Sequence, residues 1–361
     1  MAPEQPFASQ GLPACDAVCL SMDVDCGVGD VVDGANRVVG IEDAFIDPVF
    51  REMLPRFLDE IEDLGIRMTF FIIAATVDTA ERRAILRRMT ERGHEVASHS
   101  LTHPKAFGDL DGPDLHRELA QSKAVLEDAA GAAIEGFRAP GFFVDDRVLA
   151  AVEAAGYRYS SSINSSVLYN LSKMAFLLRE KLSFINPVTS YYIEPRSLLA
   201  PRFPYRPQPT AFWRRCPDRD LVELPISMGL FRLLPGVTFA SDAMLPLGIG
   251  TRFIAGLIHR LPFANIVIHD FEYLLASDFA PGTPIPRSTA LTWAMPRDRK
   301  TAHLHSVLQS GRQSLPLREM VRQHASARLI GVPVQELERS EVQLLRDGSP
   351  PAEPEIDQVK R

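Results

Sequence analysis

The 361-residue sequence is acidic: 39 Lys and Arg stand against 46 Asp and Glu, for a formal net charge of −7. This balance excludes a protein whose main partner is nucleic acid, because phosphate binding needs a basic surface. No apolar run reaches the roughly 18 residues of a spanning helix, and the first residues lack a signal-peptide pattern. We therefore expect a cytoplasmic location.

Short apolar runs alternate with helical patterns along the chain. Apolar spacing predicts helices from Asp47 to Leu64, from Asp114 to Ala130 and from Asp145 to Gly156. Strands that alternate with helices form a mainly parallel sheet, so the sequence predicts an α/β fold that closes, or nearly closes, into a barrel. The predicted strands are 17–23, 67–73, 94–98, 134–138, 157–160, 221–226 and 264–268.

Two carboxylates, Asp23 and Asp25, stand at the end of the first predicted strand. Strand alternation places them on the same side if the strand continues. Two carboxylates are costly to hold close together unless a cation or a base lies between them. The alternative is a polar strand end that runs into a turn at Gly27 and Gly29.

Two histidines, His99 and His103, follow the third predicted strand in the segment SHSLTHP. In a helical turn this spacing brings both imidazoles to one face, which suits a metal site. Exposed histidines also match this spacing by chance, but the carboxylates upstream favour a metal site with two histidines and one carboxylate. A zinc site on Cys15, Cys19 and Cys26 is a less favoured alternative, because no CxxC pair is present.

Arg138 and His269 each follow a predicted strand, in the segments FRAPG and IVIHD. Both would lie at the barrel end where the other motifs lie. The planar guanidinium of an arginine there can clamp a carboxylate. The alternatives are a surface arginine before a turn and a histidine at the barrel rim.

Together and in this order, the motifs resemble those of the NodB-type polysaccharide deacetylases, carbohydrate esterase family 4. The resemblance covers about residues 16–275, with a divergent stretch at 163–220. It implies a distorted (β/α)7 TIM-like barrel of the NodB homology type with an irregular Pro-rich insertion after strand five. It also implies three parts: an extension at 1–15, one deacetylase-like domain at 16–330, and a tail at 331–361 whose end has a disordered composition.

The resemblance further implies a metal-dependent hydrolase that removes an N-acyl group, with acetyl expected, from an amino sugar or glycan precursor. The implied ligands of a divalent ion are Asp25, His99 and His103; zinc is expected, with Co²⁺, Fe²⁺ or Mn²⁺ as alternatives. The other implied roles are a general base, Asp23; its partner, Arg138; an acid, His269; and an oxyanion-binding N–H at Gly141, after Pro140.

Two departures from the family pattern stand out. The first motif reads DVD, whereas many members have adjacent aspartates. Many members also have an Asp-Trp pair after strand five, where this chain has Tyr159 followed by three serines. The carboxylate that would tune the acid His269 is therefore missing from its expected place, and we expect Glu223, on the sixth strand, to substitute for it near the substrate.

Other functions stay open at this point. One is a deformylase or small-amide hydrolase of the same family, including one that acts on a lipid-linked sugar. Another is a non-catalytic relative that binds glycan or lipid.

Apolar residues recur at helical spacing in 166–182, from Val167 to Leu178. A helix packed on the barrel is the favoured interpretation, and a helix that lies on the inner face of the membrane is the alternative.

Overall fold

A computed structural model describes the chain over residues 17–26, 30–32, 38–41, 46–104, 107–167, 170–171, 194–227, 263–279, 297–298, 300–301, 304 and 313–325. The predicted extension at 1–15 and tail at 331–361 lie outside these residues, so the predicted domain limits stay a prediction. No helix of the described part is long and apolar enough to cross a membrane.

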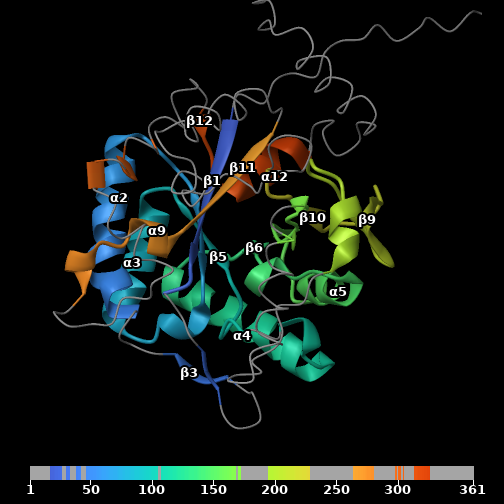
Figure 1. Ribbon diagram of the computed structural model, residues 1–361, viewed down its shortest axis with the longest axis horizontal. Coiled ribbons are helices and arrows are strands. Elements are labelled where there is room, and N and C mark those ends of the chain that lie inside the picture. Colours follow the sequence, from blue (N-terminus) through green and yellow to red (C-terminus); the bar gives the residue numbers. More distant parts are fainter. Residues whose placement is uncertain are drawn as a thin grey trace, which may run out of the picture.

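A curled parallel sheet forms the centre of the molecule (Figure 1). Its strands follow the order β10-β7-β6-β5-β4-β1-β11, and each neighbouring pair is parallel. The predicted α/β barrel architecture and its seven strands are thereby confirmed. The strands are β1 (Ala17–Val24), β4 (Thr69–Ile72), β5 (Glu95–Ser98), β6 (Gly136–Phe137), β7 (Tyr159–Ser160), β10 (Val222–Glu223) and β11 (Ala264–His269).

The sheet order ends at β10 and β11, and side chains join this seam. Ser227 and Asn265 exchange two hydrogen bonds, one from the Ser227 N–H to the Asn265 carbonyl and one from the Asn265 N–H to the Ser227 hydroxyl. The amide group of Asn265 also donates to the carbonyls of Leu224 and Pro225. These bonds bring the two end strands together into a nearly closed barrel.

Helices cover the outer side of the curled sheet (Figure 1). The three predicted helices are present as η1 (Pro48–Met53) continuing into α2 (Leu54–Asp63), as α4 (Gly112–Ala130) and as α5 (Asp146–Ala154). Asp145 caps α5 as predicted, and α4 begins at Gly112 and Pro113, the residues expected to mark its start, with Asp111 as its cap. The other helices are η2 (Ala74–Thr76), α3 (Ala80–Glu91), η3 (Phe107–Asp109), η4 (Pro140–Phe142), η5 (Pro195–Leu199), α9 (Asp270–Tyr273), η7 (Ala276–Asp278) and α12 (Leu317–Ala325).

The predicted insertion after strand five contains more regular structure than its prolines suggest. Its described part, from residue 194, holds η5 and an antiparallel hairpin of β8 (Pro207–Gln208) and β9 (Ala211–Arg215). The hairpin docks on the barrel where the Phe212 N–H donates to Asp146 at the start of α5. Most of the predicted helix at 166–182 lies outside the described residues; within it, Leu171 is 48% exposed. Contact with a membrane stays a prediction.

The amino-terminal end of the barrel is closed by late segments that we did not predict. Strand β12 (Gln313–Ser314) pairs with the start of β1, and α12 follows it. Thr69 and Glu95 accept hydrogen bonds from the first N–H groups of α12, at 2.9 Å each. The buried Glu95 carboxylate therefore caps a helix from the middle of the barrel, and burial raises its pKa to about 7.

We expect Gly136→Ala to destabilise the barrel, because a Cβ at Gly136 would lie 2.1 Å from the ring of the buried Tyr159. Overpacking of this kind costs about 1–3 kcal/mol. Urea unfolding of the purified variant measures the loss. Gly112→Ala is the matched control, since a Cβ at Gly112 meets nothing within 4 Å. Equal stability of the two variants would contradict the expectation.

Candidate metal and catalytic site

The predicted site residues gather at the carboxyl ends of the parallel strands. Asp23, near the end of β1, is in register with His269 at the end of β11. Asp25 follows β1 directly, His99 follows β5, and Arg138 follows β6. Topology therefore brings together residues that lie up to 246 positions apart in the sequence, as a parallel barrel does at this end.

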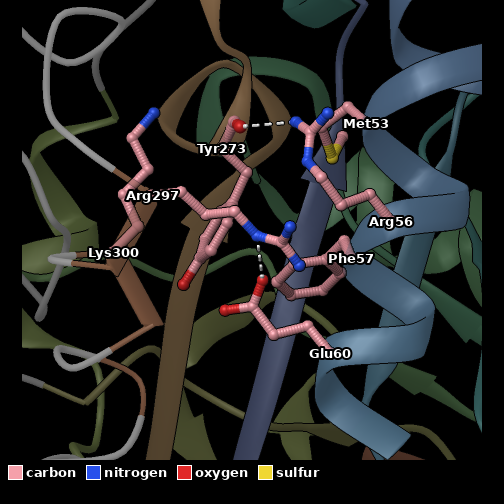
Figure 2. Close-up of a pocket in the computed structure, with 7 residues that line it drawn as sticks. All are labelled: Met53, Arg56, Phe57, Glu60, Tyr273, Arg297 and Lys300. Atoms are coloured by element: carbon pink, nitrogen blue, oxygen red, sulfur yellow. Dashed lines mark hydrogen bonds and ion pairs between the residues drawn. The ribbon is translucent and has the colours of Figure 1, made fainter.

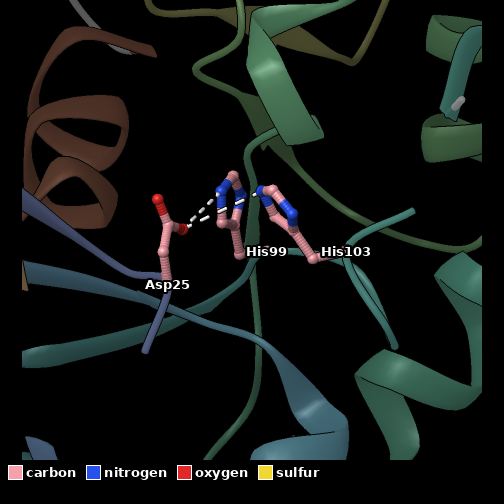
Figure 3. Close-up of side chains that lie close together, drawn as sticks. All are labelled: Asp25, His99 and His103. Carbon is pink, nitrogen blue, oxygen red and sulfur yellow. Dashed lines mark ion pairs between the residues drawn. The ribbon is translucent and has the colours of Figure 1, made fainter. Parts of the chain in front are cut away.

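Asp25, His99 and His103 converge as a set of three ligand atoms that all lie within 4.8 Å of one another (Figure 3). Oδ1 of Asp25 is 3.3 Å from Nε2 of His99 and 3.9 Å from Nε2 of His103. This buried oxygen has no hydrogen-bond partner of good geometry among the described residues. Because buried polar atoms are otherwise paired, the set fits a divalent cation.

The two imidazoles are prepared for ligation in different ways. The carbonyl of Arg138 accepts a hydrogen bond from Nδ1 of His99 at 2.8 Å, which leaves Nε2 facing Asp25. Burial lowers the pKa of His103 to about 4, so its imidazole is neutral and can bind a cation at neutral pH. Burial alone would raise the pKa of Asp25, but the nearby imidazoles of His99, His103 and His269 hold it below its usual range.

The conformation that we predicted for the two histidines is wrong, although their proximity is correct. Residues 99–103 form no helical turn. Instead, Ser100 (φ 68°) and His103 (φ 55°) adopt left-handed backbone conformations that bend the chain so that both rings face Asp25. A tight loop, and not a helical turn, therefore brings the two imidazoles together.

Backbone strain in the described residues concentrates around this site. All non-glycine residues with positive φ lie in the three loops that carry the predicted motifs. Strain of this kind costs about 1–3 kcal/mol per residue and gathers at functional sites, because the surrounding structure must hold it in place. The residues are Cys26, Ser100, His103 and Phe142.

Arg138 forms the predicted ion pair with Asp23. The pair is almost wholly buried, with side-chain exposures of 0% for Arg138 and 2% for Asp23. Further bonds from Arg138 reach the hydroxyls of Ser21 and Ser161 and the carbonyl of Ser161, and the guanidinium carbon lies 3.9 Å from the centre of the Phe71 ring. Arg138 thereby holds the Asp23 carboxylate in a fixed orientation.

The serines that replace the Asp-Trp pair of many relatives hold the Arg138 segment. Ser161 supplies two of the acceptors for Arg138, and the hydroxyl of Ser162 accepts the N–H of Ala139. Pro140 is buried and Gly141 has φ 59°, a left-handed conformation that favours glycine. Gly141 lies in η4, which directly follows Arg138 and Ala139; an oxyanion-binding role for its N–H stays a prediction.

The carboxylate beside His269 is Glu272, not Glu223. Glu223 instead accepts the N–H groups of Ser162 and Ile163, both at 2.9 Å, and burial raises its pKa. Nδ1 of His269 lies 3.5 Å from Oε1 of Glu272, and Nε2 lies 3.8 Å from Oδ2 of Asp23. Glu272 is three residues after His269, on the short helix α9, where one turn returns its side chain to the histidine.

Charge around His269 favours its protonated form. Burial alone would lower its pKa, but the hydrogen bond to Glu272 and the charges of Asp23 and Asp25 outweigh burial and raise the pKa to about 9. His269 is therefore protonated at neutral pH, as a general acid must be. The ring also stacks on Phe271, with 5.0 Å between the ring centres.

A small cavity on the α2 side of the barrel is separate from this site (Figure 2). It has room for about one water molecule, and none of the predicted site residues lines it. Each of its cations has a partner: Arg56 pairs with Asp278, Arg297 with Glu60, and Lys300 donates to the carbonyl of Leu274. Its lining is Met53, Arg56, Phe57, Glu60, Tyr273, Arg297 and Lys300.

The fold and the site define a class: α/β-barrel proteins with a His-carboxylate cluster at the carboxyl ends of the strands. Comparisons with known proteins agree. Residues 42–160 match the family model for polysaccharide deacetylase. The chain is 33% identical over 111 residues to a chitooligosaccharide deacetylase of Sinorhizobium fredii, covering 30% of this chain and 49% of that protein. It is 26% identical to a peptidoglycan-N-acetylglucosamine deacetylase of Bacillus cereus, covering 31% and 49%.

A solved Mycobacterium smegmatis structure assigned to the polysaccharide deacetylases shares the fold at a TM-score of 0.51 and 17% identity, covering 92% of this chain and 99% of that chain. Over residues 42–160 the chain is similar to the polysaccharide deacetylases, the family that its motifs resemble. It spans about half the length of the S. fredii and B. cereus relatives that it matches.

Proposed function

We propose that this protein is a metal-dependent hydrolase that removes an N-acyl group, with N-acetyl expected, from an amino sugar or glycan precursor. One observation carries the proposal: the Asp25, His99 and His103 cluster lies beside a buried Asp23–Arg138 pair, with His269 opposite. The deacetylase activities of the S. fredii and B. cereus relatives support the substrate class.

Asp25, His99 and His103 would hold the divalent ion, for which two imidazoles and a carboxylate favour zinc. When bound, such an ion supplies Lewis-acid polarisation of the amide carbonyl. The fit rests on the buried, unpaired Oδ1 of Asp25 and on the neutral imidazole of His103.

The remaining groups divide the proton transfers between them. Asp23, held in place by its ion pair with Arg138, takes a proton from the attacking water. The N–H of Gly141 stabilises the oxyanion. His269 then donates its proton to the departing amine, which is a poor leaving group when it is not protonated.

The proposal is tested by loading the protein with zinc and incubating it with N-acetylated chitooligosaccharides and with N-acetyl and N-formyl glucosamine. We expect the protein to release acetate. Mass spectrometry of the sugar product measures the loss of the acyl group. Release of formate alone would favour the deformylase alternative, and release of neither acid from any substrate by zinc-loaded protein would favour a non-catalytic relative. A cytoplasmic location stays a prediction.

We expect Glu272→Gln to move the basic limb of the pH-rate profile to lower pH. Activity that needs protonated His269 is lost as the pH rises through the pKa of His269. Since Glu272 helps to raise that pKa to about 9, removing its charge lowers the pKa, and the loss begins at lower pH. Initial rates between pH 6 and 10 measure the shift.

Glu223→Gln is the matched control for this prediction, because it neutralises a buried carboxylate that binds Ser162 and Ile163 instead of His269. Its basic limb should match that of the wild type. A shift in Glu223→Gln without one in Glu272→Gln would restore Glu223 as the partner of the acid.

A further inference from the structure

The loop that carries the two histidines, residues 99–103, is held in an unfavourable conformation. Ser100 and His103 both have positive φ, which side chains other than glycine rarely adopt. Such conformations persist only where surrounding contacts over-determine them. The contacts that hold this loop therefore decide whether His103 faces Asp25.

Hydrogen bonds to the neighbouring η2 segment and within the loop hold part of its backbone. The carbonyls of Ser100 and Leu101 accept the N–H groups of Ala74 and Ala75, at 3.1 and 2.8 Å. The hydroxyl of Ser100 accepts the N–H of His103 at 2.9 Å. The N–H groups of Leu101 and Thr102, between the two histidines, remain to be paired.

One carboxylate, that of Glu118, pairs both of them. Its Oε2 accepts the N–H of Leu101 and of Thr102, each at 2.9 Å, and its Oε1 accepts the Thr102 hydroxyl at 2.8 Å. Glu118 is 4% exposed and stands on α4, a helix of 19 residues that packs against β5 and α3. A rigid element thus fixes three donors of the histidine loop from one side.

We propose that Glu118 is a positioning residue for metal binding: it preforms the loop at residues 99–103 so that His103 faces Asp25 and His99. The inference rests on the proposed metal site and extends it to a residue that touches neither metal nor substrate. Because the loop is already ordered, a cation that binds there loses less binding free energy to ordering the loop. Without Glu118, two partly buried N–H groups lose their acceptor and the strained loop loses its hold on α4.

The test is zinc affinity, measured by competition with a chromogenic chelator, together with the absorption spectrum of the cobalt-loaded protein. Loss of a partner that orients a metal ligand weakens affinity by about 10–100-fold. We expect such a loss in Glu118→Ala, with a changed cobalt spectrum. Glu127→Ala is the matched control, because Glu127 lies near the other end of α4 and binds Ile134 instead of the loop.

Two milder variants keep the test decisive if Glu118→Ala fails to fold. Thr102→Val removes only the hydroxyl bond and should weaken zinc binding least, whereas Glu118→Gln keeps one oxygen for the two N–H groups and should fall between wild type and Glu118→Ala. Wild-type affinity and an unchanged cobalt spectrum in folded Glu118→Ala, or in folded Glu118→Gln if the alanine variant does not fold, overturn the inference.

The wild type separates this inference from the proposed function. If it binds zinc but cleaves no amide, the proposed activity falls and the ranking of zinc affinities still decides the role of Glu118. If it binds no divalent metal, the metal site and this inference fall together.

Discussion

Purified protein carrying His99→Ala and His103→Ala is expected to hold no divalent ion and to show no activity, whereas the wild type holds about one ion per chain. Each substitution removes one of the converging imidazoles and leaves Asp25 without a second or third ligand. A single carboxylate does not retain zinc against water. Elemental analysis after dialysis measures the metal content, and acetate release measures the activity.

His116→Ala is the control for these variants, because His116 is exposed on α4. It should keep both metal and activity. Metal content in the double variant equal to that of the wild type would show that the site is assigned to the wrong residues.

Asp23→Asn is expected to keep the metal and lose about 10²–10⁴-fold in turnover, the worth of a general base. An amide cannot take the proton of the attacking water. The same change leaves the wholly buried Arg138 without its counter-charge, and breaking such a pair costs up to about 3–5 kcal/mol of stability. Turnover, metal content and the denaturant midpoint are therefore measured on the same preparation.

Asp25→Asn is the companion change on the neighbouring carboxylate. It should weaken metal binding, because Asp25 Oδ1 belongs to the cluster of ligand atoms. Since it leaves the Asp23–Arg138 pair in place, its stability should stay closer to that of the wild type. If the two variants exchange their phenotypes, the roles of the two carboxylates must be exchanged as well.

Local pattern was enough to predict the barrel strands, because strands buried on both faces are continuous apolar runs such as TFFI in β4. The closure by β12 and α12 was missed, since Gln313–Ser314 is too short to show a pattern and its pairing with β1 is purely tertiary. The same holds for the seam at Asn265, whose role depends on residues that approach it only in the folded barrel.

The sequence predicted which residues form the candidate site, but it did not predict their backbone conformation. Motif order located Asp23, Asp25, His99, His103, Arg138 and His269, but the histidine loop depends on positive φ values, which sequence spacing does not reveal. Glu272 was missed because the missing carboxylate was sought on a strand. A glutamate three residues after His269 was the available signal, and a helix as short as α9 gives no periodicity to support it.

The position of β1 beside β11 affects how the chain folds while it is being synthesised. Ser21 and Ile266, which share a hydrogen bond across β1 and β11, are 245 residues apart. At about 5–20 residues per second, a ribosome needs about 12–50 s to make the intervening chain. Until then the β11 side of β1 is an unpaired apolar edge, open to pairing with other nascent chains. We therefore expect that shielding this edge of β1 during synthesis limits such pairing.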